Sequence, residues 1–121
     1  MTVLVTGANG FVGKYLVKSL LSSGEDIIAC GRDDLNIARI EDFSHLPNHI
    51  STVVHLAARV PRGSWKYTVR DYVEVNGIGT HNVLEWCLRK GVKKVVYAST
   101  EMVIGTPLYQ PVDEKHPTHP S

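Results

Sequence analysis

The sequence has little of what marks several specialised classes of protein. Only two cysteines occur, Cys30 at the end of an expected strand and Cys87 in an expected helix, so we expect buried free thiols and no disulfide framework. No run approaches the roughly 18 apolar residues of a membrane span. The net charge is +1 without an acidic or basic block, which indicates neither a nucleic acid nor a membrane surface as partner. Met1 leads directly into an apolar run without a charged leader, so we expect no signal peptide and a cytoplasmic location.

The 121 residues contain enough apolar material for one globular domain, because 43% of them are hydrophobic. Short β-branched runs alternate with stretches in which apolar residues recur every three or four positions, as in alternating strands and helices. We expect strands at 2–6, 26–30, 52–58 and 94–98 with a possible short one at 35–37, and helices at about 10–23, 40–43 and 68–90. This alternation predicts an α/β domain built on a parallel sheet.

A glycine-rich turn joins the first expected strand to the first expected helix. Gly7, Gly10 and Gly13 have the spacing G-x-x-G-x-x-G in place of the commoner G-x-G-x-x-G. Glycine permits a tight turn and a close approach of the backbone to a ligand, and the helix N-terminus directs unpaired N–H groups at that ligand. The pattern predicts a pyrophosphate site, and the alternative is a glycine-rich turn without a ligand.

Small and hydroxyl-bearing residues follow two further strands. Ala57 and Ala58 leave room at the end of one strand, and Ser99 and Thr100 end another. Because ligands of open α/β sheets lie beyond the carboxyl ends of the strands, we expect these residues and the glycine turn to share one crevice. His55 lies mid-strand between apolar neighbours, so we expect a packed, hydrogen-bonded core histidine and not a catalytic one.

The end of the second expected strand bears on the choice of cofactor. In NAD-binding folds an acidic residue near this point accepts hydrogen bonds from the adenosine ribose. Here Gly31 occupies the strand end and Arg32 follows it, and a guanidinium can stack on adenine and pair with a 2′-phosphate. The sequence therefore favours NADP over NAD. The alternative is a surface arginine with Asp33 or Asp34 at the ribose.

Four ordered motifs carry a resemblance to a known family. They are residues 5–13 (VTGANGFVG), 55–58 (HLAA), 76–80 (NGIGT) and 96–100 (VYAST), the last followed by Val103 and Gly105. Together they resemble the extended short-chain dehydrogenase/reductases, a family of NAD(P)-dependent nucleotide-sugar epimerases, dehydratases and reductases. The resemblance covers the whole chain and implies a Rossmann-like, doubly wound parallel sheet of about five strands in the order 3-2-1-4-5.

The resemblance also implies roles for individual residues. Thr100 falls at the family's catalytic serine or threonine, which hydrogen-bonds the reacting oxygen of the substrate. The glycine turn would hold the pyrophosphate, Arg32 would meet the adenosine end, and Asn76 would support the crevice at the nicotinamide end. The expected cofactor-binding residues are Gly7, Asn9, Gly10, Phe11, Val12, Gly13, Arg32, Asn36, Ile37, Leu56, Ala57, Ala58, Asn76, Ala98 and Ser99.

Some positions depart from the pattern of that family. Asn36 is more often Asp, Ile104 replaces a frequent Tyr, and the Tyr-x-x-x-Lys acid/base pair does not occur in the sequence. The resemblance thus implies the amino-terminal portion of an enzyme, truncated after its fifth strand, without the catalytic helix and the substrate domain. We expect this chain to bind the dinucleotide without turnover. The strand at 94–98 would form an exposed apolar edge, which favours self-association.

Three points stay open at the level of sequence. A non-catalytic dinucleotide-binding sensor or scaffold would use the same residues, and a Tyr-x-x-x-Lys motif encoded downstream would favour the enzyme. Asn76 either caps a kinked turn or reaches across to backbone near the cofactor. His116 and His119 have a ligand-like spacing, but Pro117 and Pro120 break any helix that would align them, so we expect a solvated tail and not a metal site.

Overall fold

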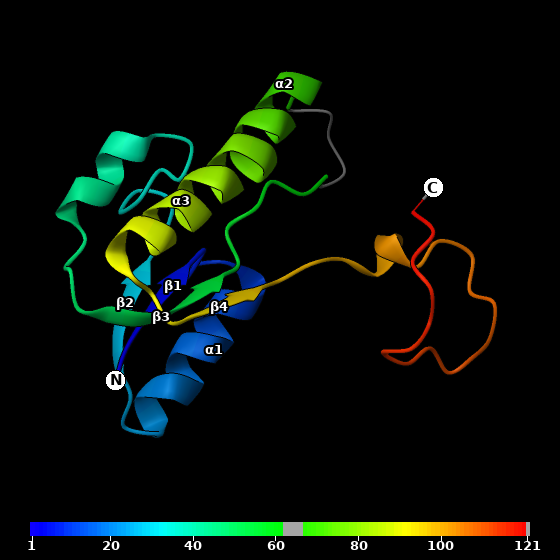
Figure 1. Cartoon of the computed structure of the whole chain (residues 1–121), viewed down its shortest axis with the longest axis horizontal. Coiled ribbons are helices and arrows are strands. Elements are labelled where there is room, and N and C mark those ends of the chain that lie inside the picture. Colours follow the sequence, from blue (N-terminus) through cyan, green and yellow to red (C-terminus); the bar gives the residue numbers. More distant parts are fainter. Residues whose placement is uncertain (62–66, 121) are drawn as a thin grey trace.

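The computed structural model describes residues 1–61 and 67–120. Four parallel strands form one sheet in the order β2-β1-β3-β4 (Figure 1). Their bounds are Thr2–Thr6 for β1, Asp26–Cys30 for β2, Ile50–His55 for β3 and Lys94–Tyr97 for β4. β1 is buried along its whole length because it pairs with a neighbour on each side and is covered on both faces. The predicted α/β domain with a parallel sheet is confirmed.

Helices cover both faces of the sheet (Figure 1). Their bounds are Phe11–Ser22 for α1, Ile40–His45 for η1, Val69–Tyr72 for α2, Val73–Gly79 for η2 and Thr80–Lys90 for α3. Val3 and Val5 of β1 pack on the α1 side, whereas Leu4 joins the core shared with η1 and α3. This split follows from the two-residue period of a strand, and it makes β1 the centre of both cores.

The predicted ends of the two long helices are confirmed. Gly24 follows the end of α1 with φ 77°, and Gly91 caps α3 with φ 67°. Both values lie in the left-handed region that favours glycine, so each helix stops where its sequence places that residue.

The predicted short strand at 35–37 does not form, and the described residues contribute four strands to the sheet. Both apolar side chains of the segment are buried in the core, but its backbone turns. The N–H of Asn36 donates to Asp42 Oδ2 at 3.2 Å, and the N–H of Ala38 donates to Asn36 Oδ1 at 3.1 Å. Because side chains occupy these donors locally, the segment does not extend the hydrogen-bonded ladder beyond β2. The order of the remaining strands is the expected one without that edge.

The long helix predicted at 68–90 spans its expected length as the continuous coil of α2, η2 and α3 (Figure 1). Thr68 starts it with a capping box, in which Thr68 and Asp71 each accept a hydrogen bond from the other's backbone N–H. Its middle part, η2, is π-helical and contains Asn76. Segments of this kind are frequent at functional sites, and Asn76 bonds to the backbone of Arg59, just after β3.

β4 lies at the edge of the sheet, and the side chain of Tyr97 at its end is 55% exposed. Beyond β4 the chain leads away from the sheet to η3 (Glu101–Val103) and then to the carboxyl-terminal segment, drawn orange to red in Figure 1. The expected pairing of this edge with another chain stays a prediction.

The prediction of a solvated carboxyl-terminal tail is wrong for His116, which is only 5% exposed. Its Nε2 accepts a hydrogen bond from the N–H of Leu108 at 2.9 Å, and its ring lies 4.7 Å from the ring of Tyr109. The tail folds on itself around this histidine. The prolines in the sequence exclude a helix there, but they do not indicate this fold. Within residues 1–61 and 67–120, no three His, Cys, Asp or Glu side chains are grouped as a metal site would require.

The two thiols behave as their positions in the sequence predict. Cys30 and Cys87 are both buried and free, and burial raises the pKa of Cys87 to about 11.

No helix in the described part of the chain is both long enough and apolar enough to cross a membrane.

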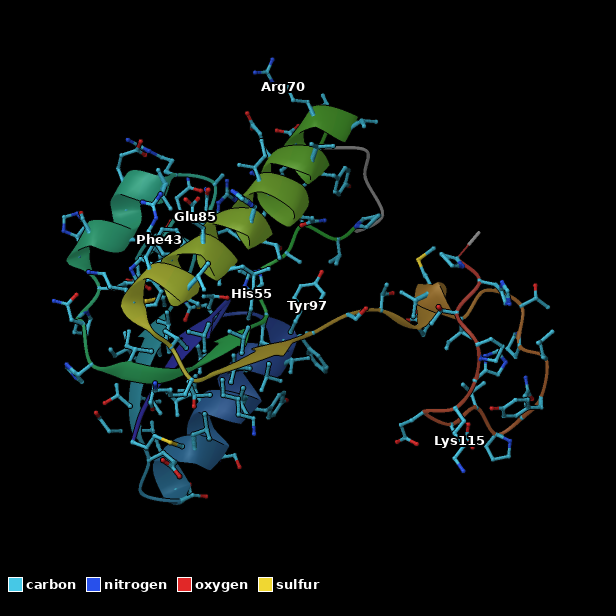
Figure 2. The ribbon with its side chains drawn as sticks, viewed as in Figure 1. Phe43, His55, Arg70, Glu85, Tyr97 and Lys115 are labelled. Carbon is cyan, nitrogen blue, oxygen red and sulfur yellow. The ribbon has the colours of Figure 1, made fainter. Side chains whose placement is uncertain are left out.

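His55 connects the sheet to α3 and is 1% exposed, as expected of a core histidine. Its Nδ1 lies 2.7 Å from Thr6 Oγ1 of β1, and its Nε2 lies 3.1 Å from Thr80 Oγ1 at the start of α3. Tyr97 of β4 lies beside it, with the two rings 5.7 Å apart (Figure 2). Burial lowers the pKa of His55, because the protonated ring would lose its hydration.

This lowered pKa gives the first prediction, for the replacement His55→Gln. As the pH falls through 6.5, the ordinary pKa of histidine, the unfolded chain takes up a proton at residue 55 before the folded chain does. The stability that depends on a neutral ring is therefore complete above that pH and is lost below it. The free energy of unfolding in urea should fall less steeply in His55→Gln than in the parent chain between about pH 7.5 and pH 5.5. The exposed His49, replaced by Gln, is the matched control and should keep the parent's slope. Equal slopes in all three proteins would contradict the prediction.

Candidate functional site

The carboxyl ends of β2, β1 and β3 open on a cleft of about 610 Å³. Its lining comes from the turn after β1, the segment after β2, the segment after β3 and η2. The lining residues are Gly7, Asn9, Gly10, Gly31, Arg32, Leu35, Asn36, Ile37, Leu56, Ala57, Ala58, Arg59, Val60, Tyr67 and Val75. This is the crevice that the strand ends predict for an open parallel sheet.

The turn after β1 forms the floor of the cleft because Gly7 has no side chain. Gly7 has φ 69°, and a Cβ on it would lie 2.7 Å from the backbone nitrogen of Ala57 and 2.8 Å from the carbonyl carbon of Leu56. Any other residue would therefore push the turn away from the end of β3. The turn is closed by a hydrogen bond from the N–H of Gly10 to the carbonyl of Gly7 at 3.0 Å.

α1 begins directly at this turn, with Gly10 as its N-cap. No side chain caps the helix, and its first turn contains no acidic residue. Gly13 lets α1 approach the turn, since a Cβ there would lie 2.7 Å from the carbonyl oxygen of Ala8. An uncapped helix N-terminus beside an open cleft presents backbone N–H groups and a partial positive charge, which favour an anion.

The β2 side of the cleft carries Arg32 as its charged residue. Gly31 leaves space that the Asn9 side chain fills, because a Cβ on Gly31 would overlap the Asn9 amide. The carboxylate of Asp34 accepts a hydrogen bond from the N–H of Gly31 at 2.8 Å, and neither Asp34 nor Asp33 lines the cleft. Arg32 is exposed and lines the cleft, so the charged residue on this side of the cleft is a cation and not a carboxylate.

The β3 side is anchored by a polar contact from the π-helical segment. Asn76 Oδ1 accepts a hydrogen bond from the N–H of Arg59 at 2.7 Å, and Asn76 Nδ2 donates to the carbonyl of Arg59 at 2.8 Å. Of the two expectations for Asn76, the structure shows the reach across to backbone. This pair of bonds fixes the chain just after Ala57 and Ala58, two small residues that line the cleft.

The structure brings together most of the residues that the sequence predicts for the site. Those that line the cleft are Gly7, Asn9, Gly10, Arg32, Asn36, Ile37, Leu56, Ala57 and Ala58. Phe11 and Val12 are exposed on the first turn of α1, Gly13 is buried beneath them, and Asn76 lies behind Arg59. Their roles toward a cofactor stay predictions.

The residues after β4 do not lie in this cleft. Ala98, Ser99 and Thr100 are exposed and are absent from its lining, since the chain turns away from the sheet after β4 (Figure 1). Thr100 caps η3 instead, with its Oγ1 accepting a hydrogen bond from the N–H of Met102 at 3.3 Å. The expected convergence of both hydroxyls on the crevice is therefore not seen in the described residues.

The lining also includes residues that the sequence did not predict as cofactor contacts. These are Leu35, Arg59, Val60, Tyr67 and Val75, together with Gly31, which the sequence placed only at the strand end. The sequence did indicate a place near the cleft for Arg59, because this residue directly follows the predicted Ala57-Ala58 strand end. It gave no such indication for Tyr67, since the place of this residue near the cleft depends on how the chain after β3 folds.

Comparison with known proteins places these features in one family. The family model described as the NAD dependent epimerase/dehydratase family matches residues 3–121. The UDP-glucose 4-epimerase of Halalkalibacterium halodurans is 32% identical over 137 residues, covering 100% of this chain and 41% of that protein. A putative UDP-glucose 4-epimerase of Methanocaldococcus jannaschii is also 32% identical, over 98% of this chain and 44% of that protein. The chain thus spans less than half the length of these curated relatives.

Solved structures resemble the chain over nearly its whole length. A short-chain dehydrogenase/reductase superfamily protein from Agrobacterium tumefaciens, with bound NAD, has a TM-score of 0.84 and 28% identity over 100% of this chain and 40% of its own. UDP-glucose 4-epimerase from Bifidobacterium longum, in complex with NAD+ and UDP, has a TM-score of 0.84 and 25% identity over 98% of this chain and 43% of its own.

Proposed function

Because this chain belongs to the NAD dependent epimerase/dehydratase family, we propose that its cleft binds a nicotinamide dinucleotide along the glycine turn. The observation that carries the proposal is the uncapped N-terminus of α1 beside a cleft of about 610 Å³, with Gly7 and Gly10 as the floor. A diphosphate is the group that such a helix end favours, and backbone without side chains lets it come close.

The charges that line the cleft suit a dinucleotide. The described lining has two charged side chains, Arg32 and Arg59, and both are cationic. The diphosphate would lie at the start of α1, the adenosine end near Arg32 and Asn36, and the nicotinamide end toward Ala58. When bound, the nicotinamide supplies a group that accepts or returns a hydride. The chain's own contribution is to bind and orient it.

We further propose that the chain prefers NADP to NAD. The support is Arg32 at the end of β2, together with the place of the two neighbouring carboxylates. Asp34 is held by the N–H of Gly31, and Asp33 lies outside the lining, so neither takes the ribose position in this arrangement. A guanidinium suits a 2′-phosphate, which NAD lacks. The two solved relatives described above contain NAD, so the proposed preference for NADP rests on the residues of the present sequence alone.

For the longer protein, we propose chemistry on a nucleotide-linked sugar, as the names of the relatives suggest. Thr100 would hydrogen-bond the reacting oxygen, and the acid/base pair of the family would come from residues outside this sequence. A non-catalytic dinucleotide-binding module is the second candidate, and it is favoured by the position of Thr100 outside the cleft. The coding sequence beyond residue 121 separates the two, because only the enzyme requires a Tyr-x-x-x-Lys motif there.

The binding proposal predicts the outcome of calorimetric titrations with NADPH and NADH. The parent chain should bind both, with NADPH the tighter. Gly10→Val should abolish binding of both, since a Cβ at residue 10 would already lie 3.1 Å from the carbonyl oxygen of Gly7 and a branched side chain would cover the diphosphate position. Arg32→Ala should weaken NADPH by about tenfold or more and leave NADH nearly unchanged, because a hydrogen bond to a charged group is worth about 1.5–3 kcal/mol.

The matched control is Lys18→Ala, which removes a cation from the exposed side of α1, outside the cleft. It should bind both cofactors as the parent does. Binding that survives in Gly10→Val would contradict the proposed site. Equal losses of NADPH and NADH in Arg32→Ala would contradict the role given to that residue in the preference.

A further inference from the structure

Arg59 carries a charge whose binding partner is missing from the described residues. Arg59 is one of the residues that line the cleft, and its Nε and Nη1 atoms are buried without a hydrogen-bond partner in the described part of the chain. Burying unpaired donors of a cation is unfavourable, and native proteins rarely leave such groups unsatisfied. The arrangement therefore points to an acceptor that lies outside the described residues.

Arg59 is held in place both at its backbone and at its guanidinium. The two hydrogen bonds from Asn76 fix the backbone of Arg59, and the ring of Tyr67 lies 4.1 Å from its Cζ atom. Stacking on an aromatic ring stabilises a cation while leaving the edge of the guanidinium free for an acceptor. The side chain is thus oriented before any ligand arrives, which lowers the entropic cost of binding.

The neighbouring carboxylate does not neutralise this charge. Asp71 is near enough for Arg59 to contribute to the lowering of its pKa, after the larger effect of the hydrogen bonds from Thr68. Its Oδ2 already accepts from the N–H of Thr68 at 2.6 Å and from Thr68 Oγ1 at 2.8 Å. Among the described residues no carboxylate forms an ion pair with Arg59.

The position of Arg59 indicates which anion it would meet. It lies two residues beyond Ala57, whose backbone touches Gly7, so it stands on the β3 side of the glycine turn. Arg32 stands on the opposite, β2 side. The turn that leads from β1 into α1 lies between the segments that carry these two arginines, because β1 lies between β2 and β3. An anion at the α1 N-terminus would thus have an arginine-bearing segment on each side.

We propose that Arg59 binds the diphosphate of the dinucleotide from the β3 side of the cleft, as a second contact besides the backbone at the start of α1. The inference rests on the proposed function. The planar fork of a guanidinium matches two phosphate oxygens, and charge-assisted bonds of this kind are the stronger ones. The two arginines then have separate tasks: Arg59 takes the diphosphate that all these dinucleotides share, and Arg32 takes the group that distinguishes them.

The test is calorimetric titration of the parent chain and its Arg59→Ala and Arg59→Met variants with NADH and with ADP-ribose. ADP-ribose has the diphosphate and lacks the nicotinamide. Both variants should lose affinity for both ligands by the same factor, about 10- to 100-fold. Arg59→Met keeps an apolar stem over the Tyr67 ring, so it separates the lost charge from lost packing. Thermal unfolding of each variant reports whether the fold is retained.

Arg39→Ala is the matched control, because Arg39 is an exposed arginine outside the cleft that pairs with Asp42. It should bind both ligands as the parent does. Unchanged affinity in the folded Arg59→Met variant would overturn the inference and leave the proposed function intact. A loss for NADH alone would overturn it too, since Arg59 would then serve the nicotinamide end. A parent chain that binds neither ligand would overturn the proposed function and this inference with it.

Discussion

The contact between the glycine turn and the end of β3 is the constraint on which the rest of the site depends. Gly7 has a left-handed backbone and lies where a Cβ would meet Ala57 at 2.7 Å. A residue with a side chain would there face about 1–2 kcal/mol of backbone strain and about 1–3 kcal/mol of overpacking. Because Gly7 follows the last paired residues of β1 and β3, this contact lets the turn lie directly against the end of β3, where it forms the floor of the cleft. Gly13 likewise has no Cβ, and this lets α1 lie close to the glycine turn.

Polar side chains then join the sheet to the helix that covers it. His55 links Thr6 of β1 to Thr80 of α3, and Asn76 links η2 to the backbone just after β3. Both contacts lie beneath or beside the cleft and outside the apolar cores. The first supports the strand ends from below, and the second fixes the segment that carries Arg59. The cleft wall is therefore held by hydrogen bonds, whereas the apolar clusters hold the layers together.

Much of this arrangement could be predicted from the sequence because it depends on local patterns. The glycine spacing, the apolar strands and the left-handed caps at Gly24 and Gly91 are each determined by neighbouring residues. The failure at residues 35–37 has a physical reason: an apolar pair indicates burial, but burial alone does not distinguish a strand from a turn whose N–H groups bond to Asp42 and Asn36.

The other failures depend on contacts between residues far apart in the sequence. The burial of His116 follows from its contacts with Leu108 and Tyr109, and no helix or strand pattern in the sequence predicts these contacts. From its residue type alone Arg59 would be expected at the surface, since arginine is seldom buried. Its position directly after the Ala57-Ala58 strand end places it near the cleft, but the contacts with Asn76 and Tyr67 that hold it there depend on tertiary structure. The path of the chain after β4 likewise depends on tertiary structure, so the place of Thr100 could not be derived from its strand.

Binding of the dinucleotide at the glycine turn can be followed through the backbone amide NMR shifts of the chain during a titration with NADPH. The largest changes should fall on the amides of residues 7–13, with further changes at 31–32 and 56–59 and little change at 104–120. These are the segments that line the cleft or begin α1, and the tail is the internal control. Saturable shift changes that leave residues 7–13 unaffected would contradict the account, because the ligand would then bind without the glycine turn.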